Sequence, residues 1–484
     1  MNVLERDLIN LAQRVQAIQS ELPEIEVKAA EKGCPKVFDS LSSLSNQSGG
    51  GTIIFGIDER NGFRTCGVYD ADDLMVQITN QCQQMEPILR PLYTVAQYED
   101  HWIVGAEIQE VEFDQRPCFY MGKGRLKGSY IRVGEQDLPM TEYEVYSYEA
   151  FRRRAQDELR ANPRPELGRL DAKLLDAYFV EIRRKKRNLA AMDNQEVLKL
   201  QGIVDQNGQA TLAGNLLLGQ YPQANFPQLC ITAVAVQGTE IGDLSEDGAR
   251  FIDNERIEGT LPQMLDGAMA FVERNTPVAT IIDPMTGKRK DRPLYPPVAV
   301  RELVLNALIH RDYSFHTETT PICLRLFHDR LEIENPGGLY GRMTLDLLGR
   351  VSADTRNPFI AVGMEILAEA ENRFSGIPTA RRLMREAGLP APEFEVYRGV
   401  FKATLYNRRK DAKKELPAGK LSDQVLEFCQ TPRSRKELEM RFPEVTIAYL
   451  MDKTMKPLIQ EGKIALTLPD KPRSKFQKYY TRLD

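Results

Sequence analysis

The sequence predicts an α+β protein built from several domains, and three observations lead to this fold class. The chain has 484 residues, which is more than one ordinary domain contains. Hydrophobic residues make up 42% and charged residues 27% of the chain, a balance typical of folded globular proteins. Helical and strand-like patterns follow one another without an internal repeat, which favours mixed α/β domains.

Residues 1–145 are expected to form the first domain, a mixed α/β unit. Its first 20 residues predict an amphipathic helix that packs on the domain or forms a dimer contact, because apolar residues recur at helical spacing. These residues are Leu4, Leu8, Leu11, Val15 and Ile18. Strand patterns at 24–28 and 49–58 enclose a helical pattern at 35–46, and further strands follow to about residue 135.

Residues 146–168 predict a basic helical linker, and residues 169–407 predict a central α/β region. Two basic runs stand out, FRRR at 151–154 and RRKKR at 183–187. Such runs are most often solvated helix faces, and contact with nucleic acid is the alternative. A charged segment at 408–420 then predicts a second linker.

Residues 421–484 predict a small C-terminal domain. Its patterns run helix, turn, helix and then a pair of strands, which is the order of a winged helix.

Composition excludes several classes of protein. No apolar stretch reaches the ~18 residues that suggest a membrane span, and the N-terminus has no apolar signal core. The seven cysteines are odd in number and form no CxxC pair, which favours reduced thiols in a cytoplasm and disfavours structural zinc. The net charge of −5 excludes a uniformly basic nucleic-acid binder but allows local basic patches. We therefore expect a cytoplasmic protein without a membrane partner.

The segment PPVAVRELVLNALIHRDY at 296–313 is expected to carry chemistry. Glu302, Asn306 and His310 are four residues apart, so they line one face of a helix beside an apolar stripe. Burying these polar groups without partners would cost roughly 1–3 kcal/mol each. A nucleotide site supplies partners, because an Asn amide oxygen can bind the Mg²⁺ that bridges phosphates. Glu302 can orient a water for attack on the terminal phosphate.

The glycine turn NPGG at 335–338 can bring backbone N–H groups close to a phosphate or a base. A surface helix with a merely wet polar face is the alternative. Zinc is a further alternative, since three of the four histidines lie between 310 and 328, but their spacing matches no common ligand pattern.

Four segments together resemble the C-terminal domain of bacterial RecG-like transcriptional regulators. They are ELVLNALIHRDY, DRLEIENPGGL (329–339), TRNPFIA (355–361) and ENRFSGIPTARRL (371–383). That domain is a divergent member of the GHKL ATPase class, which has an α/β sandwich fold and includes gyrase, heat-shock protein 90 and histidine kinases. The resemblance implies an ATP site with Mg²⁺.

The resemblance also implies residue roles. Glu302 would be the catalytic base that activates water, and Asn306 would be the Mg²⁺ ligand. The adenine contact would fall at Glu334 or Asn335, and phosphate would lie near the glycine turns. The remaining cofactor-binding candidates are His310, Asp312, Gly337, Gly338, Ser375 and Gly376. The usual DxGxG motif is replaced here by ENPGG, and the second glycine box has a single glycine, so nucleotide binding is expected more firmly than hydrolysis. The chain lacks the GxxxxGK[ST] loop, so it is not expected to be a helicase.

A second resemblance concerns the N-terminal region. The segments EIEVK, SLSSLSNQSGGGTIIFGIDERNGFRTCGV, RPCFY and SYIRVG resemble the Schlafen AlbA-type domain, which in bacterial regulators is presumed to bind DNA. Lys28 is the nucleic-acid-binding candidate. In nuclease-active Schlafens two Glu five residues apart and one Asp hold Mn²⁺ or Mg²⁺, and Glu21, Glu26 and Asp58 match that spacing. Ordinary surface charge is the alternative.

The C-terminal region resembles the winged helix that ends many of these regulators. A recognition helix would span about 444–460 and enter a major groove, although many winged helices mediate only protein contacts. The basic residues expected to contact phosphate are Lys453, Lys456, Lys471, Arg473 and Lys475.

Three functions follow as hypotheses. The first is a nucleotide-responsive DNA-binding regulator that forms a homo-oligomer and binds double-stranded DNA. The second is a Schlafen-like metal-dependent nuclease that acts on tRNA or single-stranded nucleic acid, for example in defence. The third is a scaffold that inherits both folds without their activities.

Overall fold

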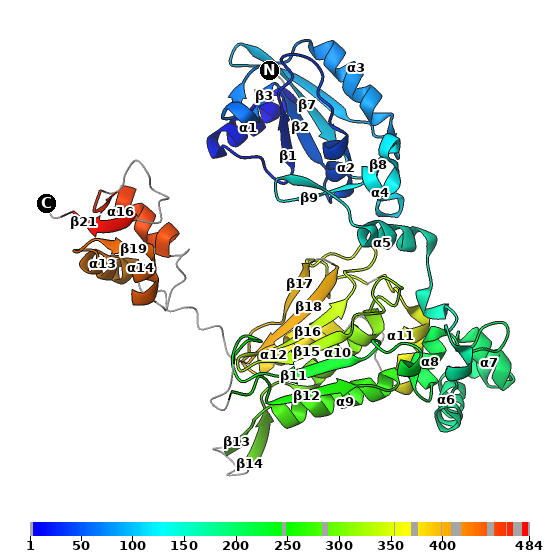
Figure 1. Cartoon of the computed structure of the whole chain (residues 1–484). Coiled ribbons are helices and arrows are strands. Elements are labelled where there is room, and N and C mark those ends of the chain that lie inside the picture. Colours follow the sequence, from blue (N-terminus) through cyan, green and yellow to red (C-terminus); the bar gives the residue numbers. More distant parts are fainter. Residues whose placement is uncertain are drawn as a thin grey trace. The chain divides into compact units, whose positions relative to one another are not determined.

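The protein is described by a computed structural model. It covers residues 3–243, 248–282, 289–352, 354–368, 376–397, 399–407, 418–442, 450–460, 462–467 and 477–482. The chain divides into two compact units. One comprises Met1–Leu383 with Pro392–Thr404, and the other comprises Met384–Ala391 with Leu405–Asp484. Helices and mixed sheets alternate along the chain, as predicted for an α+β multidomain protein (Figure 1).

A four-stranded sheet forms the centre of the N-terminal domain, in the order β1-β2-β7-β6. Its strands are β1 (Ile25–Lys28), β2 (Gly51–Phe55), β6 (Leu92–Tyr98) and β7 (His101–Ile108). β1 runs parallel to β2, and the other pairs are antiparallel. Because side chains alternate along a strand, Ile54 faces one core of the domain while Ile53 and Phe55 face the other.

Helices cover both faces of this sheet. They are α1 (Val3–Ile18), α2 (Phe38–Asn46) and α3 (Ala71–Cys82). The predicted N-terminal helix is confirmed, and it buries Leu8, Ala12 and Val15 against the core that contains Ile54. Residues of α2 and α3 contribute to the opposite core. Smaller elements complete the domain: β3 (Ile57–Asp58), η1 (Glu59–Asn61), β4 (Arg64–Thr65), β5 (Met85–Glu86), η2 (Phe113–Gln115), β8 (Phe119–Tyr120), η3 (Met121–Lys123), α4 (Gly124–Gly128), β9 (Tyr130–Val133) and β10 (Gln136–Pro139).

Helix α5 (Glu142–Arg153) follows the N-terminal domain. It begins with a capping box, in which Thr141 and Glu144 satisfy each other's backbone N–H groups, and it ends at Arg154 in the left-handed region. A group of short helices follows: η4 (Asp157–Leu159), η5 (Pro165–Leu167), α6 (Ala172–Lys185), η6 (Arg187–Leu189), α7 (Asn194–Leu200), α8 (Leu212–Leu218) and η7 (Pro222–Ala224).

Two polar side chains fix this helical group to the central domain. The fully buried Glu158 carboxylate accepts hydrogen bonds from the Phe359 and Ile360 N–H groups at 3.0 and 2.8 Å, which satisfies the start of helix α11 (Pro358–Leu367). Lys185, from the second basic run, donates to the carbonyl of Glu365 at 2.9 Å, near the end of the same helix. The segment 146–168, expected as a linker, therefore contains a residue that packs into the central domain.

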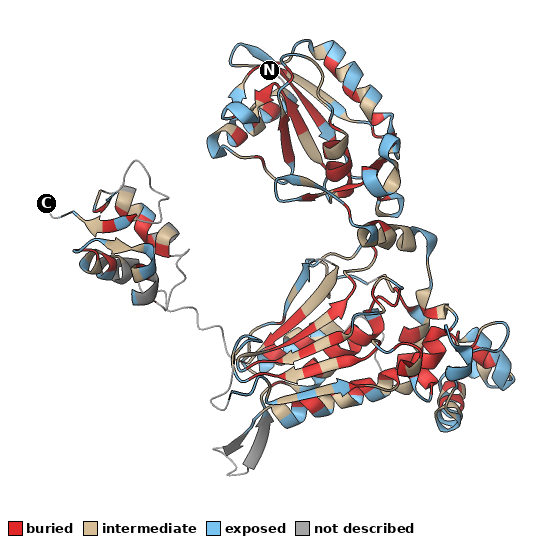
Figure 2. Cartoon of the chain, in the orientation of Figure 1, coloured by how far each residue is buried: buried red, intermediate tan, exposed pale blue. Residues whose placement is uncertain are grey.

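The central domain contains a six-stranded sheet in the order β12-β11-β15-β16-β18-β17. Its strands are β11 (Ile231–Ala235), β12 (Asp253–Ile257), β15 (Ile322–Leu326), β16 (Arg330–Pro336), β17 (Glu393–Tyr397) and β18 (Val400–Tyr406). Helices α9 (Leu261–Asn275) and α10 (Pro297–His310) contact each other and this sheet. Buried residues concentrate in the strands, as Figure 2 shows. This layered arrangement agrees with the predicted α/β sandwich.

Three further elements belong to the central domain. Helix α12 (Gly376–Glu386) is the next helix along the chain after α11. Strands β13 (Val278–Ile282) and β14 (Arg289–Pro293) pair with each other and form a separate hairpin. Throughout the described residues, none of the helices combines the length and the apolar character needed to cross a membrane.

The C-terminal unit has a core of its own and a three-stranded sheet in the order β19-β21-β20. Its elements are α13 (Ala418–Phe428), β19 (Arg433–Ser434), α14 (Arg435–Arg441), η8 (Leu450–Met455), α16 (Lys456–Gln460), β20 (Ile464–Leu466) and β21 (Lys478–Thr481). The described part of the predicted recognition helix is helical, as a π-helical turn followed by α16. Lys471, Arg473 and Lys475 lie outside the described residues, as does the side chain of Lys453.

Candidate functional site

Helix α10 carries the polar face that its spacing predicts. It begins with Pro297, whose fixed φ angle and missing N–H suit the first turn of a helix. Its apolar stripe is buried, whereas Glu302 and Asn306 are half-buried and His310 is exposed. Most of the helix is thus held rigidly in the core while one polar edge stays accessible.

The NPGG turn lies against the C-terminal end of α10. The Asp312 N–H donates to the Pro336 carbonyl at 3.0 Å, and the Gly337 N–H donates to the Gly399 carbonyl at 2.8 Å. Gly337 has a φ of +106°, and a Cβ there would lie 2.6 Å from Cβ of Asp312. Only glycine therefore satisfies both the backbone conformation and the close packing at this position.

Asp312 holds this turn in place. Its carboxylate lies 2.9 Å from Nη1 of Arg356, accepts a hydrogen bond from the Tyr143 hydroxyl at 2.7 Å and accepts another from the Ser314 N–H at 2.8 Å. Burial alone would raise the pKa of Asp312, but the Arg356 charge and these hydrogen bonds lower it below its ordinary value. The ionised Asp312 side chain is thus committed to protein partners, and it positions the glycine turn.

A cavity of about 150 Å³ lies between α10, the sheet and the segment that follows the NPGG turn. Its wall is mainly apolar, with a few polar groups, which is the usual character of a small-molecule site. The apolar lining residues are Leu303, Ala307, Ile333, Leu339, Met343, Leu348, Val351, Ile377, Phe394, Phe401 and Ala403. The polar ones are Asn306, His310, Asn335, Tyr340 and Asp354, and the glycines are Gly337, Gly338, Gly349 and Gly376.

The strand pleat separates the two residues that were expected near the base, because only one of them lines the cavity. Glu334 pairs with Arg325 at 2.6 Å and accepts from the Tyr397 hydroxyl at 2.9 Å, and it does not line the cavity. Asn335, the next residue, lines the cavity with only 4% of its surface exposed. Its Oδ1 atom has no hydrogen-bond partner among the described residues, so a ligand can satisfy it.

Gly376 lies at the other end of the polar face of α10. A Cβ on Gly376 would be 2.7 Å from Oε2 of Glu302 and 3.2 Å from Nδ2 of Asn306. Gly376 is also the first residue of α12, and a helix N-terminus carries partial positive charge that favours phosphate. Ser375, the other expected residue of this box, lies outside the described residues.

The His310 ring lies on the cavity wall and is exposed there. The protein around it removes part of its hydration, and the Arg356 charge acts in the same direction, so the pKa of His310 is lowered. The ring is therefore neutral at pH 7 and can either donate or accept one hydrogen bond.

The residues present fit a magnesium nucleotide. Mg²⁺ in such sites takes one or two protein oxygens and completes its shell with water and phosphate. The Asn306 amide beside the start of α12 would supply such an oxygen, next to a helix N-terminus whose partial charge favours phosphate. The Oδ1 atom of Asn335, which has no partner among the described residues, would serve as an acceptor for a base.

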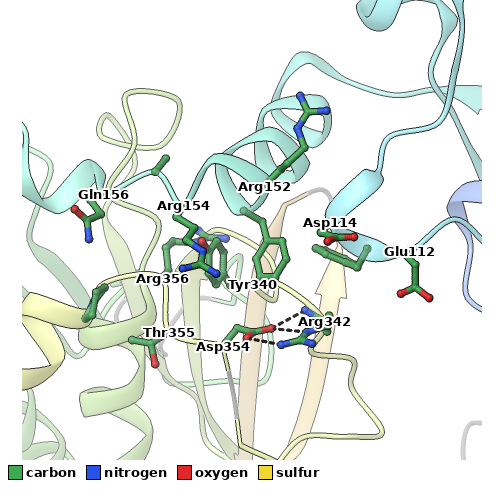
Figure 3. A pocket seen from close by; sticks show the side chains of 14 residues that line it. Glu112, Asp114, Arg152, Arg154, Gln156, Tyr340, Arg342, Asp354, Thr355 and Arg356 are labelled. Carbon is green, nitrogen blue, oxygen red and sulfur yellow. Dashed lines mark hydrogen bonds and ion pairs between the residues drawn. The ribbon is translucent and has the colours of Figure 1, made fainter. Parts of the chain in front are cut away.

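A second cavity of about 560 Å³ adjoins the first, and sequence patterns alone did not reveal it (Figure 3). The two cavities share Tyr340 and Asp354. Arg342 holds Asp354 through two hydrogen bonds from its guanidinium, at 3.3 and 3.2 Å, and one from its N–H at 3.1 Å. The rest of the wall comes from residues 112–114 of the N-terminal domain, from α5 and the residues that follow it, and from residues 355–358 of the central domain. The lining residues named in Figure 3 are Glu112, Asp114, Arg152, Arg154, Gln156, Tyr340, Arg342, Asp354, Thr355 and Arg356.

The N-terminal acids converge on an arginine. Arg132 donates to Glu26, to Asp137 at 2.9 Å and to Glu21 at 3.1 Å, and its side chain is almost completely buried. Lys28 pairs with the second oxygen of Glu26. Burial and the neighbouring Glu26 raise the pKa of Glu21 to about 7.

This arrangement does not fit a divalent metal, because the guanidinium occupies the space between the carboxylates. Asp58, the third predicted ligand, caps η1 by accepting hydrogen bonds from the Arg60 N–H at 3.1 Å and from the Asn61 amide. Within the ranges that the structure describes, no cluster of three His, Cys, Asp or Glu residues could hold a metal ion.

Two family models match the chain. Residues 21–141 match the model described as "Schlafen, AlbA_2". Residues 319–405 match HATPase_c_4, described as "Putative ATP-dependent DNA helicase recG C-terminal". Both resemblances drawn from the motifs are thereby confirmed. The second match includes Asn335 and Gly376, and it begins after α10.

Solved structures give weaker likenesses. The crystal structure of the DIP2311 protein from Corynebacterium diphtheriae is 18% identical over 95% of this chain and 93% of that chain, with a TM-score of 0.40. The solution structure of the N-terminal domain of "Putative ATP-dependent DNA Helicase RecG-related Protein" from Nitrosomonas europaea is 22% identical over 28% of this chain and 93% of that chain, with a TM-score of 0.23. No curated protein matches the chain.

The chain therefore joins a Schlafen AlbA_2 domain to a HATPase_c_4 domain, and these two domains indicate a nucleic-acid-related protein that binds ATP.

Proposed function

We propose that this chain is a nucleotide-responsive DNA-binding protein, and specifically a transcriptional regulator. The observation that carries the proposal is the cavity beside α10. It brings together two amides inside a domain of the ATPase type. Asn335 is nearly buried, and its Oδ1 atom has no partner among the described residues, whereas Asn306 of α10 lies beside the N-terminus of α12. A domain of the Schlafen AlbA_2 type precedes it in the same chain.

The two ends of the cavity suit the two ends of a nucleotide. Asn335 lies next to the glycine turn, which packs on the residues just after α10. Asn306 and Gly376 lie further back along the helix, and the span from Glu302 to His310 is about 12 Å at the usual rise per residue. The base would lie at the glycine turn, and the phosphates would lie at the start of α12.

The protein residues supply distinct functions to a bound nucleotide. A bound Mg²⁺ would offset the charge on the phosphates, with Asn306 as its protein ligand. Glu302, one turn earlier on α10, is placed to orient a water and accept its proton. We propose ATP hydrolysis by this route as an extension of nucleotide binding.

Helix α5 offers a path from the nucleotide cavity to the N-terminal domain. Tyr340 lines the cavity, and its ring lies 5.5 Å from the ring of Phe151 in α5. Phe151 in turn makes an edge contact with Phe113 of the N-terminal domain at 5.0 Å. Tyr143, also in α5, donates to Asp312 beneath the glycine turn. A nucleotide that shifts the turn or Tyr340 would therefore act on α5.

The DNA contacts are assigned to the terminal domains. The order of helices and strands in the C-terminal unit is compatible with a winged helix. Its candidate phosphate contacts are Lys453, Lys456, Lys471, Arg473 and Lys475, and the N-terminal candidate is Lys28. Double-stranded DNA is the proposed nucleic acid, and a homo-oligomer is the proposed assembly.

The arrangement of the N-terminal acids favours nucleic-acid binding over metal-dependent cleavage of nucleic acid. Arg132 neutralises Glu21 and Glu26, so these carboxylates stabilise the fold and leave no room between them for a metal ion. We therefore propose the regulator as the main function and keep the metal-dependent nuclease as the second candidate.

The proposal can be tested with labelled genomic duplex fragments and the full chain. Fluorescence anisotropy should detect DNA binding, and Mg–ATP should change the affinity. Asn306→Ala should bind the same DNA without responding to Mg–ATP. Mg–ATP should also raise the melting temperature of the wild type, because a ligand that binds only the folded form stabilises it.

Two results would overturn the proposal. One is the absence of DNA binding to any fragment, and the other is an unchanged melting temperature at saturating Mg–ATP. Incubation with tRNA and single-stranded DNA in Mn²⁺ provides the remaining check. Cleavage that disappears in a Glu21→Ala, Glu26→Ala double variant would favour the nuclease instead.

A further inference from the structure

The cavity that Asn335 lines also has aromatic side chains in its wall. The rings of Phe394 and Phe401 both line it, and they stack with centroids 5.8 Å apart and an interplanar angle of 23°. Ile333 lines the cavity from the neighbouring strand β16. Flat apolar walls of this kind accept any purine ring, so they do not distinguish one purine from another.

One polar group of this cavity is the side-chain amide of Asn335. Only 4% of the surface of this residue is exposed. Among the described residues, its Oδ1 atom has no hydrogen-bond partner, and none of their hydrogen bonds involves its Nδ2 atom. An amide with neither atom held can turn over at little cost and can present either its acceptor or its donor to a ligand.

Purines differ in the group that such an amide would meet. Adenine has a 6-amino donor beside an N1 acceptor. Hypoxanthine and guanine have a 6-oxo acceptor beside an N1–H donor. An amide can pair with both arrangements by turning over, whereas a carboxylate only accepts hydrogen bonds and repels a 6-oxo group.

We infer that Asn335 makes the nucleotide site a general purine site, which accepts 6-oxo purine nucleotides as well as ATP. The inference rests on the proposed nucleotide function and specifies its ligand class. Asn335 is the specificity-determining residue, and replacing it by aspartate should restrict the site to adenine.

Isothermal titration calorimetry on the full chain with Mg–ATP and Mg–ITP tests this inference. ITP carries the 6-oxo group without the extra 2-amino group of GTP, so it isolates the contact with Asn335. Wild-type affinities for the two nucleotides should agree within about fivefold, because each can form an equivalent hydrogen bond. In Asn335→Asp the affinity for ATP should stay within about fivefold, and that for ITP should fall at least about thirtyfold.

Glu334→Gln is the matched control. Glu334 is the neighbouring residue on the same strand, but its carboxylate pairs with Arg325 and Tyr397 outside the cavity. The ratio of ATP to ITP affinity should not change in this variant. Thermal unfolding of each variant checks that it folds, and the wild-type ratio needs no variant at all.

The outcomes separate this inference from the proposed function. If the wild type binds ATP more than about thirtyfold better than ITP, the inference is wrong and the nucleotide function stands. An unchanged ratio in a folded Asn335→Asp variant also contradicts it. If neither nucleotide binds, both the inference and the proposed function fail.

Discussion

Glu302 and Asn306 lie one helical turn apart and are assigned different chemistry, so their substitutions should separate binding from hydrolysis. Glu302→Gln keeps a hydrogen-bonding side chain of the same shape but cannot accept a proton. We expect it to bind Mg–ATP with wild-type affinity and to slow hydrolysis by about 10²–10⁴-fold. Phosphate release and calorimetry measure the two quantities. If Glu302→Gln weakens Mg–ATP binding by the same factor as it slows hydrolysis, the residue holds the nucleotide and is not the catalytic base.

Glu158 makes stability depend on pH. Burial raises its pKa from 4.5 to about 7, although the Phe359 and Ile360 N–H groups partly oppose this effect. The folded state therefore binds a proton more tightly than the unfolded state. The stabilisation that Glu158 contributes is complete below about pH 4.5 and is lost as the pH rises through about 7.

The corresponding variant is Glu158→Gln, which keeps an acceptor for the helix start and removes the titration. Urea unfolding at about pH 5 and about pH 8 measures the free energy of unfolding at each pH. Between these two values, the wild type should lose up to about 3 kcal/mol more of this free energy than the variant. Glu21 titrates in the same direction in both proteins, so the difference between them isolates Glu158. Parallel pH curves for the two proteins would rule out a titrating Glu158.

Among the structural elements, the NPGG turn gives the sharpest comparison because its two glycines differ. A Cβ on Gly337 would collide with Asp312 and would require a positive φ. A Cβ on Gly338 would meet only the side chain of Val396, at 3.7 Å. Gly337→Ala should therefore destabilise the unit by roughly 1–3 kcal/mol and weaken nucleotide binding.

Gly338→Ala should change the free energy of unfolding little, and it serves as the control for stability. Thermal unfolding and calorimetry are the measurements for both variants. Equal effects of the two substitutions would mean that the turn does not need the left-handed backbone of Gly337.

At the scale of the whole molecule, DNA binding should show the salt dependence of phosphate contacts. Each lysine or arginine that neutralises a phosphate adds roughly 0.9 to the slope of log affinity against log salt concentration. Replacing Lys471, Arg473 and Lys475 by alanine together should therefore lower the slope by up to about 3. Anisotropy over a series of salt concentrations measures it. An unchanged slope would mean that these residues contact protein or solvent only.

The sequence by itself determined the local elements and the faces they bury. Helical spacing identified α1 and the polar edge of α10, since a period of 3.6 places every fourth residue on one face. Strand alternation and glycine position identified β1, β2 and the NPGG turn. The motifs within 24–134 and 302–383 also identified both domain families, which the model matches at 21–141 and 319–405 confirm, because those residues carry local backbone requirements that a sequence displays directly.

Only the tertiary structure decided which side chains meet. Arg132 lies 106 residues from Glu26, so no local pattern could show that it occupies the space expected for a metal. Which of Glu334 and Asn335 faces the cavity depended on which side of β16 packs toward α10. The second cavity combines segments from three regions of the chain. Spacing fixes the direction of a side chain relative to its own element, and its partners depend on how distant elements pack.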